Sequence, residues 1–268
     1  MAGMTEGYVY GGEHDYVHTE QFKGASFFLA DLAGARFRDC ELVDVRIVDC
    51  VVSDVTIAGD VQRLVVNDVD VTAYVEGELD RRHPERVPIR ALRTATAPRI
   101  DDVRAIAAVL DQRWTDLLVR AERLPEAARQ ERVHGEWSIV ETLRHLTFCI
   151  DAWISRTVLD EEGPYHRLGL PAGGYPSAVA ATLGLTLDAT PTYAEAKQVW
   201  QSRAEVLRTV IAEQDDAGLL RLCTRNPGPG YPTDPVPVFQ CVRVALNEHC
   251  EHGRYAERDL TVLEQRLS

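Results

Sequence analysis

The chain has 268 residues, 45% of them hydrophobic, which is enough apolar material for one large or two modest folded domains. A formal net charge of -13 argues against a general nucleic-acid binder, because phosphate contacts need Lys and Arg. We identify no long apolar run and no signal peptide, so we expect a cytoplasmic protein without a membrane span. Six scattered cysteines without a CxxC pair are typical of reduced thiols.

Large apolar residues recur at every fifth position from Phe22 to Ile57. Smaller residues such as Ala25 and Ala30 lie two positions before them. Neither a helix nor a flat strand has a period of five, so the pattern predicts a coil in which every fifth residue turns inward. The run resembles the pentapeptide-repeat family, with Ala30 to Leu32 as its best match. The resemblance implies a short right-handed quadrilateral β-helix.

Some pentapeptide-repeat proteins bind topoisomerase as acidic mimics of DNA, and residues 1–90 are acid-rich here. The repeat is far too short for a DNA-like surface, so we expect a solvated outer face and no topoisomerase partner. The next segment, Glu76 to Pro98, is rich in Arg and Pro and predicts a linker. We therefore expect an α+β chain with two separately folding domains, residues 1–90 and 91–268.

Four long helices are predicted in the second domain, which indicates a four-helix bundle. Capping boxes at Ser138 to Glu141 and at Thr192 to Glu195 mark the starts of the second and third helices. Long connections rich in Gly and Pro follow both of these helices, and loops of this length are commonly functional. We expect them to form the walls of a pocket. The predicted helices cover residues 101–124, 138–159, 192–214 and 238–263, and the connections cover residues 160–190 and 226–237.

Glu248 and His252 lie four residues apart on the last predicted helix. They project from one face, as two ligands of one metal ion do. His145, on the apolar face of the second helix, is the candidate third ligand. His249 is an alternative to Glu248, because it lies three residues before His252. Cys149 points the same way as His145; we expect a core residue there, with a ligand role as the alternative.

Two segments resemble motifs of the DinB-like superfamily, which includes mycothiol-dependent maleylpyruvate isomerases and bacillithiol and mycothiol S-transferases. They are Trp137 to Leu146 and Asn247 to Leu260. The resemblance implies a four-helix bundle that holds a divalent metal through one ligand on the second helix and two on the last. Matched residue by residue, these ligands are His145, Glu248 and His252. It also implies a homodimer.

Two imidazoles and a carboxylate suit catalytic zinc, but the same set also binds non-haem iron, and nickel would fit. The leading hypothesis is a metal-dependent transferase, in which the cation favours the thiolate of a small thiol that attacks an electrophilic substrate. Most basic residues are Arg, which we interpret as a sign of a high-GC genome, so mycothiol is the natural co-substrate. The alternatives are a metal-dependent hydrolase and a non-catalytic binding or stress-response module with a structural metal.

Overall fold

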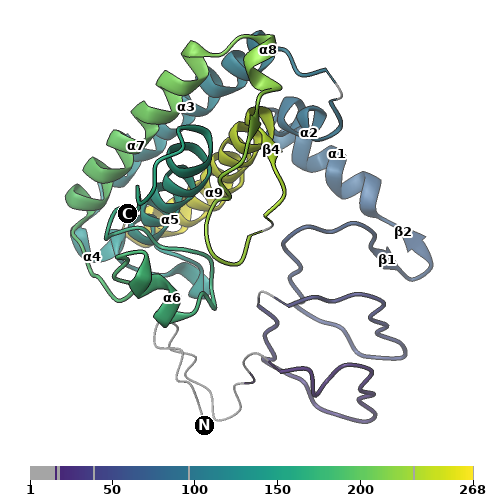
Figure 1. Ribbon diagram of the computed structural model, residues 1–268. Helices are drawn as coiled ribbons and strands as arrows, with labels where there is room; N and C mark the ends of the chain where they lie inside the picture. Colours follow the sequence, from purple (N-terminus) through teal and green to yellow (C-terminus); the bar gives the residue numbers. More distant parts are fainter. Residues whose placement is uncertain (1–15, 17–18, 39, 96, 232, 268) are drawn as a thin grey trace.

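The computed structural model describes residue 16 and residues 19–38, 40–95, 97–231 and 233–267. Its largest part is a group of long helices, and the N-terminal segment lies to one side of it (Figure 1). In these ranges no helix is both long and apolar enough to cross a membrane. The elements in chain order are β1 Val65–Val66, β2 Val69–Asp70, α1 Thr72–Arg82, α2 Arg86–Thr94, α3 Ile100–Glu122, α4 Glu126–Arg129, η1 Val133–Gly135, α5 Ile139–Ile150, η2 Asp151–Val158, α6 Ser177–Thr182, α7 Tyr193–Glu213, α8 Asp216–Leu219, β3 Leu222–Cys223, β4 Val236–Pro237 and α9 Val238–Leu267.

The predicted helical bundle is confirmed, and it consists of α3, α5 with its continuation η2, α7 and α9. Helix α5 packs against α7 and α9, and α3 packs against the same two helices from the other side. Each helix buries its apolar stripe in a shared core, as an amphipathic helix must. The core runs along the whole bundle, with Ile154 and Val242 in one half and Trp114 and Leu143 in the other.

Both predicted capping boxes are present and fix where two of the bundle helices begin. Ser138 Oγ accepts a hydrogen bond from the Glu141 amide at 3.2 Å, and Glu141 Oε2 accepts one from the Ser138 amide at 3.0 Å. Thr192 and Glu195 form the same reciprocal pair before α7. These bonds satisfy amides that a helix leaves free in its first turn. The cap at Ser138 thereby sets the rotation of α5, which carries His145.

The second predicted helix is not α-helical to its end, because its last part, Asp151–Val158, is the π-helix η2. Asp151 is fully buried at the junction. Its carboxylate accepts hydrogen bonds from the His166 amide at 2.8 Å and from Arg203 Nε at 2.7 Å. These partners come from the following loop and from α7. The π-helix therefore begins at a buried, hydrogen-bonded carboxylate, which sequence periodicity cannot reveal.

The segment that we interpreted as a linker forms two helices, α1 and α2, which is a correction. Helix α2 packs against α9, and its Ile89 and Leu92 belong to the bundle core. Pro88 is the third residue of α2, a position in the first turn where a missing N–H costs no intrahelical bond. Proline was the main reason to predict a linker here, yet its place in the helix makes it compatible with α2.

The structure does not show the expected β-helix. No strand is found in described residues 19–64, and the eight large apolar side chains expected to point inward are 42–66% exposed. A period of five is present in the backbone, because positive φ angles occur at Gly24, Leu29, Gly34, Asp44, Asp49, Asp54 and Gly59. A repeat this short gives each inward residue few stacking neighbours, since solenoids generally need at least about three repeats to bury a core.

Among the residues that the structure describes, the Arg38 side chain connects this N-terminal segment to the bundle. Arg38 donates hydrogen bonds to the carbonyl of Gly135 and, at 3.3 Å, to Glu136 Oε2. Both acceptors lie directly before Trp137, in the turn that leads into α5. The N-terminal segment therefore contacts the bundle next to the residues that begin its second helix.

Candidate metal centre

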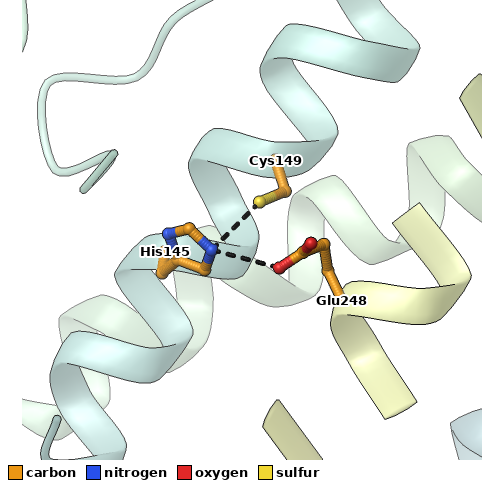
Figure 2. Close-up of side chains that lie close together, drawn as sticks. All are labelled: His145, Cys149 and Glu248. Carbon is orange, nitrogen blue, oxygen red and sulfur yellow. Dashed lines mark hydrogen bonds and ion pairs between the residues drawn. The ribbon is translucent and has the colours of Figure 1, made fainter. Parts of the chain in front are cut away.

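Four potential ligands converge where α5 faces α9 (Figure 2 shows three of them). Glu248 Oε2 lies 3.3 Å from the Nε2 atom of His145 and also 3.3 Å from the Nε2 atom of His252. The same Nε2 atom of His145 also lies 3.3 Å from Cys149 Sγ. One ligand atom each from His145, Cys149 and Glu248 falls within 4.8 Å of the others.

Helical spacing explains this convergence. Cys149 follows His145 by four residues on α5, and His252 follows Glu248 by four on α9, so each helix contributes two side chains about one turn apart. The two helices pack against each other, which places the two pairs face to face. The sequence predicted a triad of His145, Glu248 and His252, and the structure brings these three together. It also adds Cys149, which we had expected to be a core residue.

A carbonyl outside the helices fixes the orientation of His145. Its Nδ1 atom lies 2.9 Å from the carbonyl oxygen of Leu170, which can only accept a hydrogen bond. Nδ1 therefore carries a hydrogen whether the ring is charged or neutral, and Nε2 faces Glu248 and Cys149. Histidines that ligate metals are typically held in this way through their second nitrogen.

Arg144 holds the loop that supplies this carbonyl. The side chain is buried and donates hydrogen bonds to four backbone carbonyls of the loop between η2 and α7. They belong to Leu168, Thr186, Leu187 and Ala189, at 2.7–3.1 Å. Sequence reasoning missed this residue, although an arginine beside His145 on a largely apolar helix is a usable signal. Its guanidinium satisfies carbonyls that the irregular loop would otherwise leave unpaired.

His249, the alternative ligand, faces a different part of the core. Its Nδ1 atom donates to the carbonyl of Ala245 at 2.7 Å, and its Nε2 atom accepts from Trp200 Nε1 at 3.3 Å. Burial lowers the pKa of His249 to about 4, so the ring is neutral. Both ring nitrogens are used within the protein. The structure therefore does not bring His249 to the cluster.

The site has a strong preference for positive charge. Burial by itself would lower the pKa of His145, but the neighbouring Cys149 and Glu248 outweigh burial and raise it to about 10. Burial likewise opposes the charged form of Glu248, yet hydrogen bonds from His145 and His252 hold its pKa well below the usual range. Burial lowers the pKa of His252 and raises that of Cys149. In the absence of a metal ion, a proton on His145 thus balances the negative charge of the Glu248 carboxylate.

The donor set fits a divalent metal ion. In a tetrahedral zinc site with ligand distances of about 2.0–2.3 Å, neighbouring ligand atoms lie about 3.3–3.8 Å apart. The distances from Glu248 Oε2 to the two imidazoles and from Cys149 Sγ to His145, each 3.3 Å, fall in this range. Two imidazole nitrogens and a carboxylate are ligands of zinc and iron, and a thiolate is a soft ligand that favours zinc. His145, Glu248 and His252 could hold such an ion, with Cys149 within reach of it.

Trp137 covers the two imidazoles of the cluster. Its ring is stacked on His252 with a centroid distance of 5.6 Å and an interplanar angle of 20°, and it contacts the His145 ring at 4.6 Å. This residue lies just before the Ser138 cap, in the turn that Arg38 contacts. The indole shields the histidines from water on this side, which strengthens the electrostatic interactions inside the site.

Comparison with protein families gives one match. The family described as the DinB superfamily matches residues 109–256, which is more than half of the chain. The matched range includes His145, Cys149, Glu248 and His252. No curated protein and no solved structure matches the chain.

Proposed function

Since this chain belongs to the DinB superfamily, we propose that it is a metal-dependent transferase that joins a low-molecular-weight thiol, such as mycothiol, to an electrophilic substrate. The observation that carries the proposal is the cluster of the buried His145 with the half-buried Glu248 and His252, with the buried sulfur atom of Cys149 beside it. A bound divalent cation, zinc in the first place and nickel or iron as alternatives, would stabilise a thiolate at neutral pH.

The protein's own groups have separate parts in this reaction. Glu248 holds both imidazoles through one oxygen, and the carbonyl of Leu170 keeps His145 Nε2 turned toward the site. Trp137 excludes water from the side of the histidines. Exclusion of water matters because a competing water molecule would turn the transfer of a thiol into hydrolysis.

The test is a conjugation assay with purified, zinc-loaded protein. Mycothiol or N-acetylcysteine is mixed with a model electrophile such as 1-chloro-2,4-dinitrobenzene, and the products are identified by mass spectrometry. We expect a thioether product that depends on the metal and is lost in His145→Ala. A product that carries water instead of the thiol would support the hydrolase. A fully metallated protein that forms neither product would refute both enzyme proposals.

A specific observation favours one other candidate, a structural metal in a non-catalytic module. Ligand atoms of His145, Cys149 and Glu248 lie within 4.8 Å of one another, so Cys149 would be a fourth protein ligand beside His252. Structural zinc sites are closed by four such ligands, whereas catalytic sites keep one position open. The variant Cys149→Ala separates the two. A structural site would lose metal and stability, whereas the transferase would keep both zinc and conjugation activity.

The finer organisation of the N-terminal segment is also a proposal. The five-residue spacing of positive φ angles supports a short right-handed quadrilateral β-helix of pentapeptide repeats, within a first domain of residues 1–90 beside a second of residues 91–268. We propose a homodimer, with no nucleic acid and no topoisomerase as partners. Limited proteolysis, size-exclusion chromatography with light scattering, and a topoisomerase pull-down test these points.

A further inference from the structure

The loop between β3 and β4 contains one aromatic residue in a stretch of Gly and Pro. Its sequence from Asn226 to Tyr231 alternates proline and glycine before the tyrosine, and the backbone turns with positive φ at Gly228 and Gly230. The Tyr231 amide donates a hydrogen bond to the carbonyl of Gly228 at 3.3 Å and closes the turn. This geometry fixes the direction in which the Tyr231 side chain leaves the loop.

Two other tyrosines attach this loop to the loop that follows η2. The Tyr165 hydroxyl donates to the carbonyl of Pro227 at 2.5 Å, and the Tyr175 hydroxyl donates to that of Pro229 at 3.4 Å. Tyr165 approaches the backbone so closely that a Cβ atom on Gly228 would lie 2.6 Å from its hydroxyl oxygen. The two long loops are therefore joined where they meet the bundle.

Tyr231 packs against the continuation of the helix that carries His145 and Cys149. Its ring contacts that of Trp153 edge to face at a centroid distance of 5.4 Å. Trp153 follows Cys149 by four residues, just as Cys149 follows His145, so the three residues form a row along α5 and η2. Burial raises the pKa of the Tyr231 phenol, and the nearby Cys149 and Glu248 raise it further. The phenol is therefore protonated at neutral pH.

The hydroxyl of Tyr231 is available to a ligand. The hydroxyls of Tyr165 and Tyr175 are used to hold the loop, but in the described part of the chain the Tyr231 hydroxyl makes no hydrogen bond. The surroundings are aromatic, since Phe148 stacks on Tyr165 at 5.8 Å and also contacts Tyr175. A half-buried phenol without a hydrogen-bond partner, close to these aromatic side chains, suits a substrate with an apolar body and one oxygen acceptor.

We propose that Tyr231 is a catalytic hydrogen-bond donor to the electrophile, and that this electrophile carries an oxygen atom that gains negative charge as the carbon–sulfur bond forms. The inference rests on the proposed thiol transfer. An epoxide with an aromatic body is the simplest member of the class. The thiolate sulfur attacks a ring carbon, the carbon–oxygen bond breaks, and its electron pair goes to oxygen. Tyr231 donates its proton to that oxygen and recovers one from solvent, which received the proton of the thiol. The product is a β-hydroxy thioether.

The test compares two electrophiles with the same phenyl ring in the zinc-loaded wild type and in Tyr231→Phe. Styrene oxide has the oxygen, whereas benzyl chloride releases chloride and needs no donor. General acid catalysis typically contributes about 10²–10⁴-fold to a rate. We therefore expect kcat/KM for styrene oxide to fall by at least about 30-fold in Tyr231→Phe. The rate with benzyl chloride should change less than about twofold. Equal losses with both substrates would overturn the proposal.

Tyr175→Phe is the matched control, because it removes a phenol that holds the same loop. We expect it to lower both rates by a similar factor through loop position alone. A second measurement does not depend on turnover: 1-phenyl-1,2-ethanediol, the hydrolysis product of styrene oxide, is titrated by calorimetry. Its Kd should rise about 5- to 20-fold in Tyr231→Phe. An unchanged Kd would overturn the role of Tyr231, whether or not thiol conjugation is found. A raised Kd without any conjugation would refute the transferase proposal but not the role of Tyr231 as a hydrogen-bond donor.

Discussion

The raised pKa of His145 predicts a steep pH dependence of metal binding. Because this pKa is about 10 in the metal-free site, the imidazole carries a proton throughout the range from pH 7 to 9. A metal ion at Nε2 must displace that proton. An ordinary histidine with a pKa near 6.5 would already be neutral, and its metal affinity would be almost constant above pH 7.5. The sign is therefore clear: affinity rises with pH in a range where it would otherwise be flat.

The expected magnitude follows from the number of protons released. One proton gives about a tenfold gain in affinity for each pH unit, or about 1.4 kcal/mol, so Kd for zinc should fall about 100-fold from pH 7 to 9. The pKa of Cys149 is raised as well. If its thiolate also binds the metal, a second proton leaves and the fall approaches about 10⁴-fold.

Competition against a zinc chelator of known pH dependence measures these Kd values. Calorimetry in buffers of different ionisation enthalpy counts the protons directly. Cys149→Ser is the matched variant, since it should reduce the count from two to one if the thiolate is a ligand and leave it unchanged if it is not. A wild-type affinity that is constant from pH 7 to 9 would refute the electrostatic reasoning for His145.

Two further predictions concern the loops around the site. Arg144→Met should lower the free energy of unfolding by about 2–4 kcal/mol in urea titrations, because several buried loop carbonyls lose their donor; a loss below about 0.5 kcal/mol would contradict the role of Arg144. Gly228→Ala should cost about 1–3 kcal/mol, since φ there is 140° and the new Cβ would meet the Tyr165 hydroxyl. Much of that loss should return in the double variant with Tyr165→Phe, and a strictly additive result would count against the contact.

The bundle could be predicted because its signals are local. The Ser138 and Thr192 caps depend on residues three positions apart, and apolar periodicity identifies the buried face of each helix. Spacing of four residues also placed Glu248 and His252 on one face. That His145 lies opposite them depended on the resemblance of its flanking residues, since periodicity alone does not identify which helices are neighbours.

The remaining features depend on contacts between distant residues. His249 and Glu248 are adjacent in sequence, and the rotation of α9 that separates them is fixed by packing such as the bond from Trp200 to His249. The expected role of Cys149 changed because its neighbour Glu248 lies about a hundred residues away. The carbonyl of Leu170 belongs to a loop without periodicity, so nothing in the sequence indicated that it would orient His145.

The π-helix η2 affects how this chain tolerates insertions and deletions. Hydrogen bonds between residues i and i+5 hold more residues in each turn than those of an α-helix. A turn of η2 can therefore lose one residue and become an ordinary α-helical turn. Deleting one residue between Asp151 and Val158 would tighten the turn and leave His145 and Cys149 in place. Because the shortened turn would then match that of an α-helix, the side chains beyond the deletion would keep facing the same loops. We therefore expect this helix to tolerate a one-residue deletion here while the metal ligands and the loop contacts stay in place.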